Sequence, residues 1–314
     1  MLISDFYYIF YINIYGSRLT IYFPDAIISE EVVYGMQLSH EDIIKMLPDR
    51  KAESHKGNYG KLLLICGSMC YTGAPYLATM GALRSGAGLV YLGVPSSIHN
   101  IEAMKLTEPV IIPLDSVEGM LSVTSCAQIA PFLNKVDAVL VGPGLGQAEG
   151  TEAVVQYVLN EFKGPVVVDA DGINVLVQHK DILRRRTEDT ILTPHEGEFM
   201  RLGGDKERGR VTGAQALAKD LGCIVVLKGH HTVITDAVNT YINPTGNPGM
   251  ATGGSGDLLA GIITAMLGLG LSSLEAAAAG AWLHGASGDI CAESIGKSGM
   301  LPSDMISVLP QLLK

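Results

Sequence analysis

Short apolar runs alternate with longer helical segments from Lys61 to the C-terminal end of the chain. The runs are apolar throughout, which is typical of parallel strands buried on both faces. They predict strands at Leu62–Cys66, Leu89–Val94, Val110–Pro113, Ala138–Val141, Val166–Asp169, Thr190–Leu192 and Ile224–Leu227. A helical pattern such as Ala74–Ser85 separates most neighbouring runs. The alternation therefore predicts an α/β fold with a mainly parallel sheet that helices cover on both faces.

The C-terminal third of the pattern differs from the rest. Thr232–Thr235 and Thr240–Ile242 follow the preceding strand after short turns, so we expect an antiparallel edge there. Three helices are then predicted, at Asp257–Leu267, Leu274–Glu293 and Ser303–Leu313. No linker composition and no internal repeat follows residue 50, so we interpret residues 36–314 as one domain.

Residues 1–35 do not share this pattern. They hold half of the chain's Phe and Tyr residues, although glycine is scarce among them. The apolar run from Phe6 to Tyr15 is too short to span a bilayer and lacks the basic flank of a signal peptide. Ser39, with Asp42 three residues later, predicts an ordinary helix start after this segment. We interpret residues 1–35 as an appendage outside the core, either upstream sequence translated from a misplaced start or a membrane-surface anchor, and favour the first.

Composition narrows the class of protein. The chain has 314 residues, 47% of them hydrophobic, which is enough for a sizeable core. A net charge of −10 argues against nucleic acid or an anionic membrane as a partner. Five cysteines without disulfide-like spacing predict the reducing cytoplasm. Cys66 and Cys70 are either a metal or redox pair or structural residues; we favour the second, because no Cys or His partner pair accompanies them.

A glycine-rich loop from Gly246 to Asp257 leads into an apolar helix. Its glycines expose backbone N–H groups, and a helix N-terminus favours a phosphate or a developing oxyanion. We expect Asp257 to begin the helix, where it either caps the helix or faces the anion pocket and accepts a proton. A flexible loop with an Asp cap is the alternative.

Two familiar phosphate-binding motifs are excluded. Ser255-Gly256 follows Gly254 where a P-loop needs Lys and Ser or Thr. The segment Gly142–Gln147 has Gln where the third glycine of a dinucleotide fingerprint belongs. Phosphate chemistry in this chain therefore needs another scaffold.

Polar or small residues follow five of the predicted strands, where ligands of open α/β sheets bind. These segments are Gly67-Ser68, Gly142–Gly146, Asp169–Asp171, Thr193–Glu198 and Lys228–His231. Taken singly, Asp169 could cap a turn, His195 could satisfy backbone groups, and Lys228 could be a solvated surface lysine. Because all five lie at one edge of the sheet, we predict an active site there.

Several motifs together carry a resemblance to a known family. They are Asn58-Tyr59-Gly60, Thr72-Gly73-Ala74-Pro75, Ala82–Gly88, Gly142–Gly146, Thr193-Pro194-His195-x-x-Glu198, Leu227-Lys228-Gly229 and Gly246-Asn247 with Gly254-Ser255-Gly256-Asp257. Over residues 40–314 the chain resembles the ribokinase-like NAD(P)H-hydrate dehydratases, which are carbohydrate kinase-related repair enzymes. The resemblance implies a ribokinase-like three-layer α/β/α fold. It also implies a hydro-lyase that uses a nucleotide's terminal phosphoryl group to convert the S form of NADHX or NADPHX to NADH or NADPH.

The resemblance and the chemistry of phosphoryl transfer imply roles for individual residues. Asp257, with an ordinary pKa, is the expected base, and the N–H groups of Gly254, Ser255 and Gly256 form the anion hole. Glu198 is the expected anchor for Mg²⁺, through water. Residues implied to bind the AMP part of the nucleotide are Lys228, Gly229, His230, His231, Thr232 and Gly256. Residues implied to contact the hydrated cofactor are Ala74, Gly144, His195 and Asp257.

The sequence of the loop from Gly246 to Gly254 resembles that of the bacterial and archaeal enzymes, which use ADP and release AMP and phosphate. The family further implies a homotetramer and, for a chain of this length, epimerisation that is spontaneous or done by a separate epimerase. Two rival functions remain open: a vitamin-precursor or sugar kinase on the same fold, which would release a phosphorylated product intact, and a nucleotide sensor without chemistry. A sensor needs neither Asp257 nor the anion-hole glycines, so we favour an enzyme.

Overall fold

A computed structural model describes residues 12–15, 18–23, 26–30 and 35–314. The chain divides into two compact units, Met1–Met36 and Gln37–Lys314, each of which is described by itself. The first unit contains a small antiparallel sheet of β1 (Ile12–Tyr15), β2 (Arg18–Phe23) and β3 (Ala26–Glu30). Most of the apolar run from Phe6 to Tyr15 lies outside the described residues. No helix within the described ranges is long and apolar enough to cross a membrane.

The second unit is built on a nine-stranded sheet, as the apolar runs predicted. Its order is β14 (Thr240–Ile242), β13 (Val233–Thr235), β12 (Ile224–Leu227), β11 (Thr190–Leu192), β10 (Val166–Val168), β9 (Ala138–Val141), β4 (Lys61–Ile65), β5 (Leu89–Pro95) and β6 (Val110–Leu114). Neighbours from β12 to β6 are parallel, whereas β13 and β14 pair antiparallel. The mainly parallel sheet and its antiparallel C-terminal edge are both confirmed.

Strand β4 shows why these strands read as continuous apolar runs. Leu62 and Leu64 contribute to the core on one face of the sheet. Leu63 and Ile65 contribute to the core on the other face. All four side chains are buried, because helices cover both faces, and the strand therefore has no polar position after Lys61.

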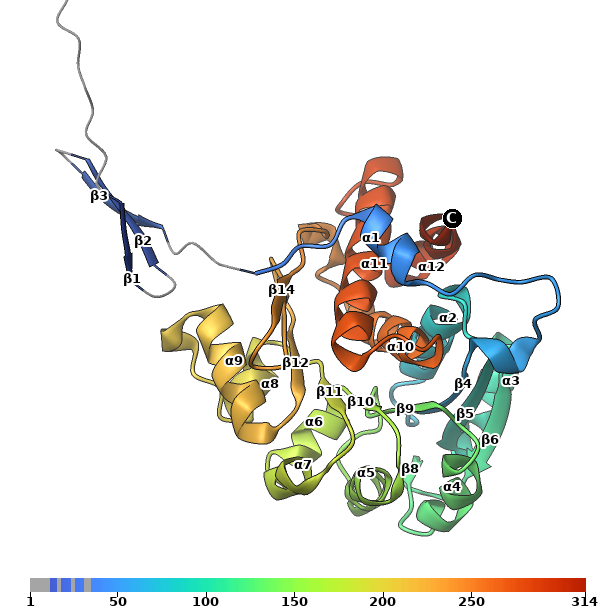
Figure 1. The fold of residues 1–314 in the computed structure, drawn as a ribbon. Helices are drawn as coiled ribbons and strands as arrows, with labels where there is room; N and C mark the ends of the chain where they lie inside the picture. Colours follow the sequence, from blue (N-terminus) through green and yellow to red (C-terminus); the bar gives the residue numbers. More distant parts are fainter. Residues whose placement is uncertain (1–11, 16–17, 24–25, 31–34) are drawn as a thin grey trace, which may run out of the picture. The chain divides into compact units, whose positions relative to one another are not determined.

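The helices form two layers, one on each face of the sheet (Figure 1). One layer holds α1 (His40–Met46), α2 (Gly73–Arg84), α10 (Ser255–Gly268), α11 (Ser273–Ser294) and α12 (Pro302–Val308). The other holds α4 (Ser125–Leu133), α5 (Glu149–Glu161), α6 (Asp171–Leu176), α7 (Lys180–Arg185), α8 (Glu196–Arg201) and α9 (Arg210–Leu221). Helix α3 (His99–Lys105) follows β5 and packs against β6 and α2. The predicted three-layer α/β/α arrangement is confirmed (Figure 1).

Two local details of the first layer follow from the sequence. Ser39 Oγ accepts a hydrogen bond from Asp42 N, and Asp42 Oδ2 accepts one from Ser39 N, so the predicted start of α1 is confirmed as a capping box. Helices α2 and α10 pack backbone to backbone, because a Cβ on Gly261 would lie only 2.0 Å from Ala78 O. This contact fixes α10, and with it the end of the glycine loop, against α2.

The strand order reverses at β4. Strands β5 and β6 continue on one side of β4, and β9 then follows on its other side. The connections that leave β4 and β9 therefore diverge and open a crevice at the carboxyl ends of the strands. The segments after β9, β10, β11 and β12 all begin at this edge of the sheet.

Candidate functional site

Helix α10 begins two residues earlier than predicted. Gly254 is its N-cap, with φ of +90°, and the helix runs from Ser255, so Asp257 is its third residue and not its first. The left-handed conformation at Gly254 turns the chain into the helix at that point, which the apolar pattern could not reveal. A Cβ on Gly254 would also lie 2.3 Å from Leu77 Cδ1. Asp257 therefore does not cap the helix, and its carboxylate is available for another role.

The three N–H groups expected to form an anion hole are not equivalent. Ser255 N donates to Thr252 O at 3.4 Å, which is a long hydrogen bond. Among the described residues, the N–H groups of Gly254 and Gly256 have no hydrogen-bond partner. These two groups, at the positive end of the 14-residue helix, are ready to receive an anion.

Two cavities meet at the start of α10. The larger, of about 770 Å³, is lined by Lys228 to Thr232, the loop from Asn243 to Gly253, and Ser255, Gly256, Leu259, Ala281, His284 and Gly285. The smaller, of about 510 Å³, is lined by Cys70, Tyr71, Gly73, Ala74, Leu77, Gly144, Ala170, Asp171, Asn174, Glu198, Arg201, Gly254 and Asp257. His195 and Gly253 line both cavities. The first turn of α10 thus contributes to both walls.

The residues singled out from the sequence divide between these cavities. Those expected to bind the nucleotide, Lys228, Gly229, His230, His231, Thr232 and Gly256, all line the larger one. Those expected to contact the hydrated cofactor, Ala74, Gly144, His195 and Asp257, all line the smaller one. Glu198, the expected metal anchor, also lines the smaller cavity.

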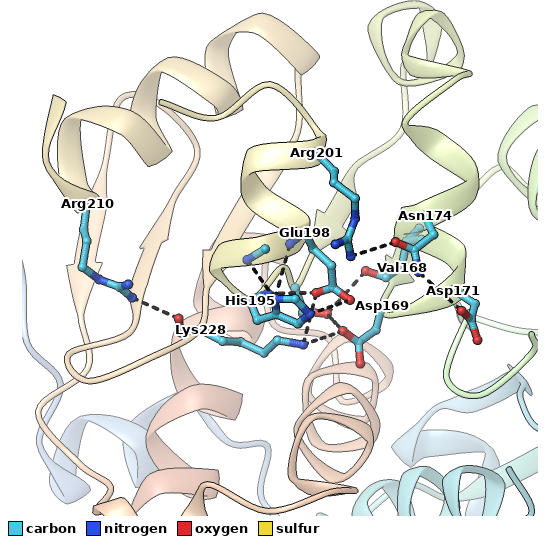
Figure 2. A network of polar contacts seen from close by, with 11 residues as sticks. Val168, Asp169, Asp171, Asn174, His195, Glu198, Arg201, Arg210 and Lys228 are labelled. Atoms are coloured by element: carbon cyan, nitrogen blue, oxygen red, sulfur yellow. Dashed lines mark hydrogen bonds and ion pairs between the residues drawn. The ribbon is translucent and has the colours of Figure 1, made fainter. Parts of the chain in front are cut away.

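Lys228 is not a solvated surface lysine. Its Nζ points toward Asp169 and Glu198 (Figure 2) and lies 2.8 Å from Asp169 Oδ1 and 3.8 Å from Glu198 Oε2. Its side chain is 20% exposed. Burial lowers the pKa of Lys228, but Asp169 and Glu198 outweigh burial and raise it, so the ammonium group stays charged. Asp169 also accepts a hydrogen bond from Thr193 Oγ1 at 2.7 Å, so it holds two neighbouring strand ends and does not merely cap a turn.

The carboxyl group of Asp257 does not have the ordinary pKa expected from the sequence. Its pKa is raised to about 6, by burial first and then by the nearby negative charges of Asp169 and Asp171, which Lys228 opposes. These groups come from other strand ends, so their influence depends on the tertiary structure. At neutral pH Asp257 is ionised, and its pKa is close enough to that pH for it to accept a proton efficiently.

His195 combines a structural contact with a place at the site. Its Nδ1 accepts hydrogen bonds from Gly197 N at 2.9 Å and Glu198 N at 3.3 Å, while Glu198 Oε2 accepts one from His195 N at 2.8 Å. This capping box begins α8, so the alternative that His195 satisfies backbone groups is correct. Because Nδ1 is an acceptor, the proton of the neutral ring lies on Nε2, 3.5 Å from Glu198 Oε1. The imidazole is over half exposed and lines both cavities.

The donor set does not form a cage for a metal ion. No group of three or more His, Cys, Asp or Glu side chains in the described part of the chain is arranged to hold one. Glu198 offers one buried carboxylate on the cavity wall, and Asp169 is already paired with Lys228. A single carboxylate fits Mg²⁺ that keeps most of its waters and takes its other ligands from phosphates. Cys66 is buried and Cys70 is exposed, and both are free thiols.

Sequence reasoning missed two residues of α11 that support the larger cavity. His284 Nε2 lies 3.2 Å from Ser255 Oγ, and burial lowers the pKa of His284 to about 4, so its ring is neutral. Asp289 accepts hydrogen bonds from Gly246 N at 2.8 Å and Asn247 Nδ2 at 2.9 Å. The available signal was the appearance of ionisable side chains inside an alanine-rich helix.

Relatives with established names cover most of the chain. A family model described as NAD(P)H-hydrate dehydratase matches residues 62–311. The "Bifunctional NAD(P)H-hydrate repair enzyme Nnr" of Moorella thermoacetica is 42% identical over 274 residues, which are 85% of this chain and 52% of that protein. The Escherichia coli enzyme of the same name is 37% identical over 284 residues, 88% of this chain and 52% of its own length. The chain therefore spans about half the length of these curated relatives.

Solved structures agree with the fold and the family. The ADP/ATP-dependent NAD(P)H-hydrate dehydratase from Bacillus subtilis, co-crystallised with ATP/Mg²⁺, superimposes with a TM-score of 0.73 at 31% identity, covering 87% of this chain and 96% of that one. A ribokinase-like superfamily protein from Enterococcus faecalis gives a TM-score of 0.78 at 28% identity, covering 88% and 94%. With the family model matching most of its length, this chain belongs to the NAD(P)H-hydrate dehydratase family of ribokinase-like proteins.

Proposed function

We propose that the chain dehydrates the S form of NADHX and NADPHX to NADH and NADPH, at the expense of ADP, which becomes AMP and phosphate. One observation carries the proposal: two adjoining cavities share the first turn of α10. The larger cavity would hold the nucleotide and the smaller one the hydrated cofactor. The transferring phosphoryl group would then lie at the unpartnered N–H groups of Gly254 and Gly256.

The residues support an order of bond changes. The C6 hydroxyl oxygen of the hydrated ring attacks the terminal phosphorus, Asp257 accepts the hydroxyl proton, and the bond from that phosphorus to the bridging oxygen breaks, which releases AMP. The ring nitrogen lone pair then expels phosphate from C6. Loss of the C5 proton to solvent restores the dihydropyridine ring. The protein's share is to position the two substrates, to stabilise negative charge and to accept one proton.

Mg²⁺ fits this scheme as an ion that accompanies the nucleotide. It would neutralise negative charge on the phosphates while bound, and Glu198 would hold it through water. The Bacillus subtilis relative was co-crystallised with ATP/Mg²⁺, which supports a role for a nucleotide and Mg²⁺ in this chain as well. Lys228, charged and paired with Asp169, adds a fixed positive group at the wall of the larger cavity.

We propose ADP as the preferred donor. If Lys228 to Thr232 hold the adenosine end at a fixed place, only one length of phosphate chain puts its terminal phosphorus beside Asp257. The sequence of the loop from Gly246 to Asp257 resembles that of the ADP-using members of the family. The Bacillus subtilis relative is named ADP/ATP-dependent, so the donor has to be measured for this chain.

The deciding experiment gives the purified protein NADHX with ADP or with ATP freed of ADP. Formation of the reduced nicotinamide ring is followed by its absorbance, and released phosphate is measured in parallel. The proposal expects one NADH and one phosphate per ADP consumed, with a higher kcat/KM for ADP. A stable phosphorylated product without NADH would show a small-molecule kinase instead, and an ATP value equal to that of ADP would remove the donor preference.

The curated relatives are named bifunctional repair enzymes, and this chain matches about half of their length. We assign only the dehydratase step to residues 37–314, because they form one compact unit and this step uses both of its two adjoining cavities described above. Epimerisation of the R form would be spontaneous or belong to an epimerase outside these residues. An epimerisation assay on the same protein tests this division.

A further inference from the structure

We propose that Arg201 binds a phosphate group of the dinucleotide substrate in the smaller cavity and thereby contributes to its specificity. The identity of the substrate rests on the function proposed above, whereas the anion-binding role rests on the charge and geometry of the cavity. The sequence motifs do not single out this residue.

The smaller cavity is acidic, and its proposed occupant is an anion. Asp171, Glu198 and Asp257 all line it. Among the described residues, Arg201 is the one Lys or Arg side chain on its wall. Lys228 faces the larger cavity and is paired with Asp169. A dinucleotide carries at least two phosphate charges, so it needs a compensating cation on the wall that it contacts.

Arg201 is oriented without being neutralised. Its Nη2 donates to Asn174 Oδ1 at 3.0 Å, and Asn174 Nδ2 in turn donates to Asp171 Oδ1 at 3.4 Å (Figure 2). Asp171 Oδ2 accepts a hydrogen bond from Gly146 N at 2.8 Å, which fixes the far end of this chain of contacts. The neutral amide of Asn174 therefore holds the guanidinium in place and leaves its charge and most of its donors available.

Several other arginines of the same layer have carboxylate partners, and Arg185, which makes no ion pair among the described residues, lines neither cavity. Arg184 pairs with Asp181 and Asp220, Arg208 with Asp205, and Arg210 with Glu196. Within the described residues, Arg201 makes no such ion pair. An unpaired guanidinium with a fixed orientation on a cavity wall is suited to bidentate contact with phosphate oxygens.

Two groups of the substrate offer phosphate oxygens for such a contact. The pyrophosphate is common to NADHX and NADPHX, whereas the phosphate on the ribose 2′-oxygen is present only in NADPHX. A comparison of the two substrates therefore identifies which group Arg201 contacts.

The test compares Arg201→Ala with Arg208→Ala, which removes the same charge from a neighbouring position outside both cavities. Binding of NADH and NADPH is followed by nicotinamide fluorescence, and kcat and KM are measured with both hydrates. We expect Arg201→Ala to weaken binding roughly 10- to 100-fold, the range for a hydrogen bond between charged groups, with kcat and the nucleotide KM near wild type. Melting temperatures of both variants should match wild type, because Arg201 has one exposed hydrogen bond.

Equal losses for both ligands assign Arg201 to the pyrophosphate, and a loss for NADPH alone assigns it to the 2′-phosphate. Unchanged binding of both ligands overturns the proposal, as does an equal loss in Arg208→Ala, which would show a general effect of charge. Because ligand binding is measured without turnover, a wild-type protein that binds NADPH but does not dehydrate NADPHX would contradict the proposed function and still test Arg201.

Discussion

Lys228 Nζ lies 2.8 Å from Asp169 Oδ1, although their strands, β12 and β10, are separated by β11. Thr193, which follows β11, donates to the same carboxylate oxygen. The pair thus connects three neighbouring strand ends beneath the two cavities. It also sets the charge around Asp257, because Asp169 raises the pKa of that carboxyl group and Lys228 lowers it.

Removing the ammonium group of Lys228 should therefore lower the stability of the fold. Lys228→Met leaves Asp169 and Glu198 buried without their cation, so we expect the free energy of unfolding to fall by about 3 kcal/mol. The double variant Lys228→Met with Asp169→Asn should recover part of this loss. Denaturant unfolding of the two single variants and the double variant measures the coupling. Independent, additive effects would show that the ion pair contributes nothing to the fold.

Asp257→Asn should separate binding from turnover. We expect the affinities for ADP and for NADPH to stay within a few-fold of wild type, because Asn keeps the size and polarity of the side chain. Turnover should fall roughly 100-fold or more, the usual scale for loss of a general base. Ligand titrations and steady-state kinetics on the same preparation check both parts. Near-normal turnover would remove the catalytic role from Asp257.

The same substitution should stabilise the protein at neutral pH. Folding raises the Asp257 pKa from 3.8 to about 6, so ionised Asp257 costs the fold up to about 3 kcal/mol above pH 6, before solvent screening. The cost disappears below the unfolded pKa, where the group is protonated in both states. The Asp257→Asn variant should therefore have a higher melting temperature than wild type at pH 8. Near pH 3.5 the two melting temperatures should be equal. A lower melting temperature at pH 8 would contradict the raised pKa.

Activity should depend on pH through the same carboxyl group. Asp257 accepts a proton only when ionised, so log kcat/KM should fall as the pH drops below about 6, with a slope that approaches one. Asp171→Asn removes a negative charge that raises the Asp257 pKa and should move this limb to lower pH. Asp181→Asn, an exposed change outside both cavities, is the control and should leave the profile unmoved. If the fall in log kcat/KM occurs at the same pH in Asp171→Asn as in wild type, the titration belongs to another group.

Asp289 should control how well the nucleotide is held. Asp289→Ala removes the carboxylate that accepts hydrogen bonds from Gly246 N and Asn247 Nδ2, so this part of the loop that lines the larger cavity loses its side-chain contacts to α11. The bond from Thr245 Oγ1 to Trp282 O remains. We expect the dissociation constant for ADP to rise about 10-fold. Calorimetric titration measures it, with Glu293→Ala, an exposed position on the same helix, as the control. Equal affinity in both variants would show that the loop holds its shape without Asp289.

Much of the fold could be predicted because burial on both faces leaves a local signature. The runs Ala138–Val141, Thr190–Leu192 and Ile224–Leu227 were predicted with the bounds that the structure shows. The short turns before Thr240–Ile242 likewise predicted the antiparallel edge. The two-residue strands β7 (Ser116–Val117) and β8 (Met120–Leu121) were missed, because such short elements have no period to detect.

The sequence by itself determined which residues gather at one edge of the sheet, because each follows a strand that the apolar pattern identifies. Only the tertiary structure decided their chemical states. The start of α10 depends on the backbone at Gly254, and the pKa of Asp257 depends on Asp169 and Asp171, which follow another strand. The places of Asp289 and Arg201 likewise depend on contacts between segments far apart in the chain. Such contacts set desolvation and charge at the site, and no local pattern of residues records them.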